Sequence, residues 1–419
     1  MNDKLLHTPE GVRDIHFKEA QKKDTLQRKI MAVFHRYGFT DVQTPTFEYI
    51  DVFNNKFSTI EVKDMYKFFD RDGNILVLRP DITPSIARLV ATNYNSNNTP
   101  KRFCYMGNTF RNVQSYQLKL KEFTQAGVEL VGIDNEDADA EIIALTIHSL
   151  LAAGLTEFQI DIGQASFIKG LFEEAGLSAD YEAELKKLID EKNYIAVEEL
   201  LDQEDLDDKH KQVLLDLPKL FGDVNVINKA KALTTNKKSI EALNRLERVY
   251  NILCDYEVER YVSFDLGMVS QINYYTGIVF RGYTFGTGVS IVDGGRYDTL
   301  IEEYGFNAPA VGFAIVIDEV MNSIERQNIE IKTEKINTLL LYNRESRKMA
   351  IKVAHRMRAD GMNIEIGMLE DSLEANIAFG QSKGIGGIMN FISEEDVTLI
   401  NLDTEETQSL DVKSLLEER

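Results

Sequence analysis

The side chains with the most chemistry to offer lie in four short segments that read RPDIT, TFR, FTQAGVE and NYYTG. They supply carboxylates in Asp81 and Glu129, a guanidinium in Arg111 and neighbouring phenols in Tyr274 and Tyr275. A carboxylate suits an ammonium group, a guanidinium suits a carboxylate, and a carboxylate with a phenol can hold a ring N–H. This set suits a zwitterionic ligand, provided that the fold brings the four segments together.

Patterns that signal covalent or metal chemistry are missing from the sequence. We find no serine nucleophile elbow, Walker loop or HExxH helix. The two cysteines, Cys104 and Cys254, are far apart and outside any CxxC or Cys/His cluster, so we expect buried thiols and no disulfide. The histidines are scattered, which predicts surface or packing roles: His7, His16, His35, His148, His210 and His355. We therefore expect no catalytic residue, no metal site and no cofactor.

Length and charge limit the class of protein. A chain of 419 residues exceeds one ordinary domain, so we expect two or three. The formal net charge of −21 repels phosphate backbones and argues against nucleic-acid binding. No apolar run approaches the roughly 18 to 20 residues of a membrane helix, and the first residues lack a signal-like apolar region. We therefore expect no membrane association and a cytoplasmic location.

Several elements must position the candidate residues. Apolar spacing predicts a helix over 16–37. A hairpin is expected around Asp72-Gly73, followed by a helix capped by Thr83 or Asp81. The segments KRFCYMGNTFR and LKEFTQAGVELVG alternate as antiparallel strands do, which places Arg111, Gln125 and Glu129 along neighbouring strands.

Composition divides the rest of the chain. Residues 178–255 are charged and strongly helical in pattern, which predicts a helical insertion within a core of residues 1–325. Residues 335–419 alternate as β-α-β-α-β, which favours a small α/β domain with parallel pairing. The glycines of GQSKGIGG follow a helix and precede a strand, so they predict a turn and not a phosphate loop.

Seven segments, in order, resemble the landmarks of histidyl-tRNA synthetase. They span residues 8 to about 321 and read TPEGVRDI, GFTDVQTPTFEY, MYKFFDRDGNILVLRPDITPSIAR, FRNVQSYQLKLKEFTQAGVELVG, NYYTGIVF, DGGRYDTL and PAVGFAI. The resemblance implies an α+β fold of the class II synthetase type: a six-stranded antiparallel sheet flanked by helices, dimeric through the motif around Pro45. The C-terminal domain resembles that enzyme's anticodon-binding region more weakly.

The resemblance also implies roles for the candidate residues. Asp81, Thr83 and Gln125 would hold the α-amino group of histidine, and Arg111 would pair with its carboxylate. Glu129, with Tyr274 or Tyr275, would receive the imidazole.

The chain departs from the enzyme where ATP is handled. Ser270 stands where the histidine-specific motif has an arginine, Glu319 replaces the arginine of the third motif, and Lys119 and Lys121 stand in place of arginines. Removing one preorganised donor typically costs about 100- to 1,000-fold in rate. Losing two, one with reversed charge, is expected to depress adenylate formation on the order of 10⁴-fold or more.

A synthetase-like chain with an amino-acid pocket but without these arginines resembles the regulatory subunits of ATP phosphoribosyltransferase. The resemblance implies a non-catalytic subunit that works with a short catalytic subunit in the first step of histidine biosynthesis, with histidine as effector. From Lys335 onward the chain has roughly ten Lys and Arg residues and about fifteen Asp and Glu residues. This excess of negative charge argues against tRNA as a partner. The alternatives are a divergent histidyl-tRNA synthetase and an amino-acid sensor that acts on another partner.

Overall fold

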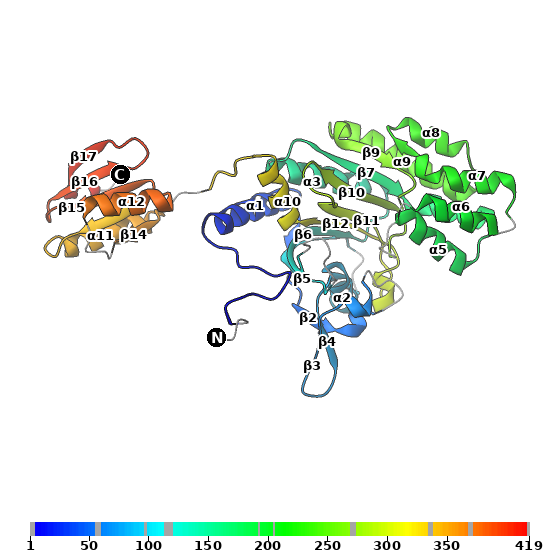
Figure 1. Cartoon of the computed structure of the whole chain (residues 1–419), viewed down its shortest axis with the longest axis horizontal. Helices are drawn as coiled ribbons and strands as arrows, with labels where there is room; N and C mark the ends of the chain where they lie inside the picture. The colour runs from blue at the N-terminus through cyan, green and yellow to red at the C-terminus, as the bar shows by residue number, and fades with distance from the viewer. Residues whose placement is uncertain are drawn as a thin grey trace. The chain divides into compact units, whose positions relative to one another are not determined.

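A computed structural model describes residues 5–416, apart from 55–59, 96–98, 113–119, 192, 204–205, 269–273, 334–337 and 368–371. The chain forms two compact units, residues 1–331 and 332–419 (Figure 1). Among the described residues, no helix has the length and apolar character to cross a membrane.

A nine-stranded sheet forms the centre of the first unit, in the order β1-β5-β6-β12-β11-β10-β7-β9-β8. Its six middle strands are antiparallel, as predicted: β5 (Lys101–Phe110), β6 (Glu122–Val131), β12 (Ala310–Val316), β11 (Val292–Arg296), β10 (Ile278–Thr284) and β7 (Phe158–Gln164). The prediction of six strands was incomplete, because three further short strands extend the edges of the sheet. These are β1 (Thr40–Asp41), parallel to β5, β9 (Val262–Asp265), parallel to β7, and β8 (Phe221–Gly222).

The two faces of this sheet pack against different helices and belong to different hydrophobic clusters. One face packs against α1 (Phe17–Arg36), α3 (Glu136–Ala153) and α10 (Ile317–Arg326), and it contributes Ala126, Val128 and Leu130 of β6 to the main core. The other face carries α2 (Thr83–Asn93) and a smaller cluster that includes Phe103 and Tyr105 of β5 (Figure 1). Alternate residues of a strand point to opposite faces. Consequently, Gln125 and Glu129 of β6 lie on the α2 side.

A three-stranded sheet precedes α2, in the order β2 (Phe47–Tyr49), β4 (Ile75–Leu78), β3 (Lys67–Phe69). The hairpin around Asp72-Gly73 is confirmed, with Gly73 at φ +86°. Helix α2 begins at Thr83 with Pro84 in its first turn, as predicted. The predicted capping residue was wrong, because Ile82 occupies the cap position and offers no side-chain hydrogen bond. The Asp81 carboxylate still accepts a hydrogen bond from the Thr83 N–H at 3.2 Å, while the Thr83 hydroxyl turns to another partner.

The predicted helical insertion contains α5 (Ala179–Asp190), α6 (Tyr194–Gln203), α7 (Asp208–Asp216), α8 (Asn225–Lys231) and α9 (Lys237–Asp255). It is not wholly helical, because β8 joins the large sheet within it. Helix α9 packs on α3 and α4 (Ala165–Ala175), so the insertion shares the main core. Short 3₁₀ turns occur at 50–52, 62–64, 217–219, 259–261, 301–304 and 412–415.

The second unit is built around a five-stranded sheet in the order β14-β13-β15-β16-β17. The predicted β-α-β-α-β order and parallel pairing are confirmed by β13 (Thr338–Tyr342), α11 (Arg347–Ala359), β14 (Ile364–Ile366), α12 (Leu373–Lys383) and β15 (Gly387–Phe391). The antiparallel strands β16 (Asp396–Asn401) and β17 (Thr407–Asp411) were not predicted. Gly384 ends α12 at φ +71°, which confirms the predicted turn.

Candidate functional site

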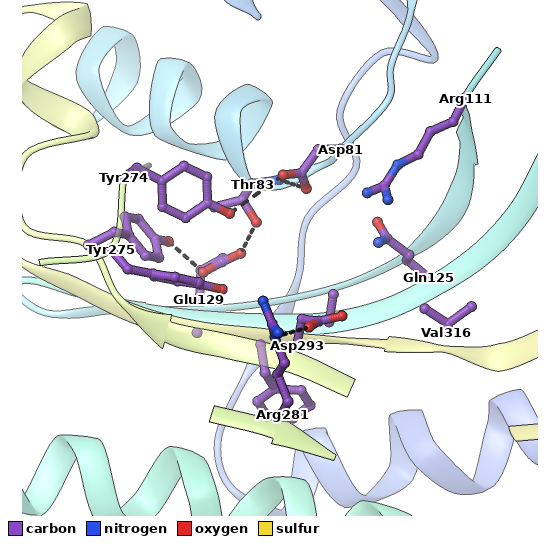
Figure 2. A pocket seen from close by; sticks show the side chains of 14 residues that line it. Asp81, Thr83, Arg111, Gln125, Glu129, Tyr274, Tyr275, Arg281, Asp293 and Val316 are labelled. Carbon is purple, nitrogen blue, oxygen red and sulfur yellow. Dashed lines mark hydrogen bonds and ion pairs between the residues drawn. The ribbon is translucent and has the colours of Figure 1, made fainter. Parts of the chain in front are cut away.

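One cavity of about 190 Å³ is lined by all seven residues that the sequence singled out (Figure 2). They are Asp81, Thr83, Arg111, Gln125, Glu129, Tyr274 and Tyr275. Tyr274, Tyr275 and Glu129 lie toward one end, and Arg111 and Gln125 toward the other. Segments far apart in the sequence therefore converge on one site.

The strands and α2 explain this convergence. Gln125 and Glu129 are four residues apart on β6, so they share a face of the sheet. Arg111 follows the last residue of β5, the antiparallel neighbour of β6. Asp81 and Thr83 stand at the start of α2, which packs against the same face.

Glu129 is the most enclosed polar group of the cavity, with 1% of its surface exposed. Its carboxylate accepts hydrogen bonds from the Thr83 hydroxyl at 2.7 Å and the Tyr297 hydroxyl at 2.5 Å. Burial raises the pKa of Glu129 to about 8, and the nearby Asp81 charge acts in the same direction, although the two hydrogen bonds oppose it. At neutral pH the empty pocket therefore holds Glu129 mainly as the neutral acid.

Asp81 and Arg111 set the charge of the pocket's middle and far end. Burial raises the pKa of Asp81, and the positive charge of Arg111 opposes that rise. The Tyr274 hydroxyl donates to Asp81 at 3.5 Å. Arg111 donates from Nε to the Pro80 carbonyl at 3.2 Å and lies over the Phe123 ring, 5.2 Å from its centroid. The guanidinium is thereby oriented toward the cavity.

Three tyrosines form the wall around Glu129. The rings of Tyr274 and Tyr275 meet edge to face at 5.0 Å, and those of Tyr274 and Tyr297 at 5.5 Å. Sequence reasoning missed Tyr297, although it lies in the DGGRYDTL segment that carried part of the resemblance. Tyr297 directly follows β11, and its hydroxyl binds Glu129.

Sequence reasoning also missed a charged pair on the cavity wall, formed by Arg281 and Asp293. The two are cross-strand neighbours on β10 and β11, with Arg281 Nε 3.4 Å from Asp293 Oδ1. Their opposite charges were a weak signal, because residues 285–291 between the two strands are too many for a two-residue hairpin turn that would fix the register. The pocket thus contains a second guanidinium, whose charge Asp293 offsets.

Gly312 and Val316 of β12 complete the wall. Gly312 is the cross-strand neighbour of Glu129, and Val316 that of Gln125. A Cβ at Gly312 would collide with the Glu129 carboxylate and with the Val128 carbonyl oxygen. Glycine is therefore required here by close packing.

The positions that depart from the synthetase motifs do not line the cavity among the described residues. Glu319 lies in the first turn of α10, half-buried, and accepts a hydrogen bond from Asn322 at 3.5 Å. Lys121 pairs through its backbone with Gly11 and Arg111. Ser270 and Lys119 lie outside the described residues.

Comparisons with known proteins agree on the relationship. The family model for histidyl-tRNA synthetase matches residues 11–320. A relative from Acetivibrio thermocellus named ATP phosphoribosyltransferase regulatory subunit is 42% identical over 411 residues, 98% of each chain. A solved structure from Bacillus halodurans, described as an ATP phosphoribosyltransferase regulatory subunit/histidyl-tRNA synthetase, has a TM-score of 0.82 and 32% identity and covers 92% of this chain and 98% of its own.

Histidyl-tRNA synthetase from Nostoc sp. PCC 7120 also has a TM-score of 0.82 and covers 98% of both chains, but at 22% identity it shows the fold alone. The fold is thus that of a class II synthetase. The 42% identity to the Acetivibrio thermocellus protein over 98% of the chain identifies the family within that fold. The chain belongs to the family of ATP phosphoribosyltransferase regulatory subunits.

Proposed function

We propose that this chain is the non-catalytic regulatory subunit of an ATP phosphoribosyltransferase and that free histidine, bound in the cavity, is its effector. A short catalytic subunit would carry out the first step of histidine biosynthesis. The family relationship supports the regulatory assignment, and the geometry of the cavity supports the effector.

The observation that carries the effector assignment is a buried acceptor without a donor. Among the described residues, Gln125 Oε1 is buried and has no hydrogen-bond partner. Leaving such a group unsatisfied costs about 1 to 3 kcal/mol. An ammonium group placed between Gln125 and Asp81 would satisfy it, and a carboxylate on the same ligand would reach Arg111.

Cavity size supports an amino acid over a nucleotide. The volume of about 190 Å³ lies below the roughly 300 to 1,000 Å³ of pockets for drug-sized ligands. At the opposite end from Arg111, Glu129 and the tyrosines offer hydrogen-bonding groups to an aromatic ring that carries N–H groups. Histidine satisfies both ends at once.

The assignment as non-catalytic rests on Glu319, which lies outside the cavity lining. Glu319 carries a negative charge where the synthetase has an arginine, and a carboxylate repels a triphosphate. A second candidate function, a divergent histidyl-tRNA synthetase, is favoured by Arg281, which could substitute for a missing arginine. The ion pair of Arg281 with Asp293 argues against the synthetase. The Asp293 carboxylate offsets the positive charge of Arg281, which would otherwise stabilise the phosphate anion that develops in adenylate formation.

We also propose that two copies associate through the three-stranded sheet. One face of this sheet buries Val77 against Met65 and Phe53. The other exposes Phe47 and Tyr49 by 53% and 54%. The exposed apolar face is continuous with the segment around Pro45 that carries the resemblance to the dimer motif, so a second copy is the occupant that we propose.

Mixing the chain with a short-form catalytic subunit tests the function. Formation of phosphoribosyl-ATP from ATP and phosphoribosyl pyrophosphate should rise on mixing and fall when histidine is added. A coupling free energy of about 1 to 3 kcal/mol between the histidine site and the active state would give roughly 5- to 150-fold control. An unchanged rate on mixing would contradict the proposal, and histidine-dependent ATP–pyrophosphate exchange by the chain alone would establish the synthetase instead.

A further inference from the structure

Three side chains of types that can ligate a metal ion come together on the sheet face opposite the cavity. The His35 Nε2 atom lies 3.0 Å from Asp41 Oδ2, and the Cys104 Sγ atom lies 3.8 Å from Asp41 Oδ1. One donor atom from each residue falls within 4.8 Å of the others. Cys104 belongs to the main core beneath α1, whereas its neighbours Phe103 and Tyr105 face the cavity side.

The fold fixes these three residues from rigid elements. Asp41 of β1 and Cys104 of β5 are paired in parallel register, so their side chains lie on the same face. His35 stands in the last turn of α1, and Gly38, at φ +78°, turns the chain back so that β1 follows beneath it. No sequence pattern indicates this cluster, because its cysteine is more than sixty residues from the other two.

The donor set matches zinc-type chemistry. Zinc binds imidazole nitrogen and carboxylate oxygen at about 2.0 to 2.2 Å and thiolate sulfur at about 2.3 Å, so two ligands of one tetrahedral ion lie about 3 to 4 Å apart. The separations of His35 Nε2 from Asp41 Oδ2, 3.0 Å, and of Cys104 Sγ from Asp41 Oδ1, 3.8 Å, fall in this range. A neutral imidazole, a carboxylate and a thiolate together carry two negative charges, which balance a divalent cation.

We propose that His35, Asp41 and Cys104 bind one divalent cation of the zinc class, with water in the fourth position. The His35 and Asp41 side chains are 47% and 69% exposed, which leaves a path from solvent and room for the water. The ion would tie the C-terminal end of α1 to the edge of the large sheet. The nearest arginine on β5, Arg102, is held by Glu141 at 2.8 Å, so its charge is already offset.

Binding has to displace the thiol proton. A coordinated thiol is deprotonated by the ion's own charge. Each cation bound therefore releases one proton to solvent, and no oxidation or reduction takes place.

Titration of the reduced, chelator-treated full chain with Co²⁺ tests the site. We expect a thiolate-to-cobalt charge-transfer absorption that saturates at one ion per chain and disappears when Zn²⁺ displaces the cobalt. Cys104→Ser should remove the absorption, and His35→Asn should weaken binding at least tenfold. The matched controls are Cys254→Ser, which changes the other cysteine, and His210→Asn, which changes a histidine paired with Asp207.

The buried Cys104→Ser variant could fold poorly, so a second test uses His35→Asn, which changes an exposed side chain. Zn²⁺ should raise the Tm of the unmodified chain and of both controls, and at the same concentration it should raise that of His35→Asn much less. Absence of the charge-transfer absorption would overturn the proposal. So would an absorption that survives Cys104→Ser or that is lost in Cys254→Ser, because the ion would then be adventitious.

Discussion

Replacing Glu129 by glutamine separates the binding role of this residue from its structural one. Glutamine has nearly the same shape, and its carbonyl oxygen can still accept one of the hydrogen bonds from Thr83 and Tyr297. It cannot carry a negative charge opposite a protonated imidazole. We therefore expect the fold to persist and histidine binding to weaken.

The magnitude follows from burial. Glu129 is 1% exposed, so its interaction with a bound ring is little screened by water. A hydrogen bond to a charged group contributes about 1.5 to 3 kcal/mol, and 1.4 kcal/mol corresponds to tenfold in Kd. Glu129→Gln should raise the Kd for histidine by about 10- to 150-fold, measured by calorimetry at pH 7.

Although Glu129→Gln should weaken histidine binding, it should not lower the free energy of unfolding. An unfolded glutamate loses its proton near its ordinary pKa of 4.5, whereas folded Glu129 keeps it up to about 8. The folded state therefore binds more protons between these values, and the stability contributed by Glu129 falls as the pH rises through that window. Glutamine removes this penalty, so the variant should be at least as stable as the unmodified chain at pH 7.

The same pKa predicts how histidine binding depends on pH. In the complex, Glu129 and the ring share one proton as a carboxylate–imidazolium pair. Free histidine acquires an additional ring proton below about pH 6.5, and empty Glu129 loses its proton above about 8. Affinity should be highest between these values and decline on either side.

Glu122→Gln is the matched control, since Glu122 lies on the same strand and accepts a hydrogen bond from Asn108 outside the cavity. It should bind histidine as the unmodified chain does. Equal affinity in Glu129→Gln and the unmodified chain would refute the placement of the ring at Glu129.

Other predictions concern packing, stability and assembly. Gly312→Ala should weaken histidine binding in calorimetry and lower the free energy of unfolding in urea, because the added methyl group would collide with the Glu129 carboxylate and with the Val128 carbonyl oxygen. Arg296→Met should lower the free energy of unfolding in urea by about 3 to 5 kcal/mol, since the buried Asp139 carboxylate loses a partner at 2.7 Å. A smaller loss would mean that Arg245 compensates. Phe47→Ser should shift the chain from dimer toward monomer in analytical ultracentrifugation, and an unchanged mass would exclude this face as the interface.

The seven residues could be predicted to line one cavity because their segments follow the order of the histidyl-tRNA synthetase landmarks along the chain. Sequence patterns also predicted β6 and the turn at Gly384, since alternation and glycine placement are local signals. Arg281 and Asp293 were missed because their meeting depends on strand register. The wrong helix cap has a similar origin, because Thr83 binds Glu129 in place of its own helix and this partner is 46 residues away. Contacts of this kind arise only from tertiary packing.

If this chain retains histidine binding while a partner chain performs the chemistry, histidine should inhibit the mixed complex through the cavity. Histidine inhibition of the mixed complex should therefore be measured with the unmodified chain and with Arg111→Ala. Both chains should stimulate phosphoribosyl-ATP formation equally, whereas inhibition with Arg111→Ala should need at least tenfold more histidine. Equal inhibition of the two complexes would contradict the claim, because histidine would then act at a site other than this cavity.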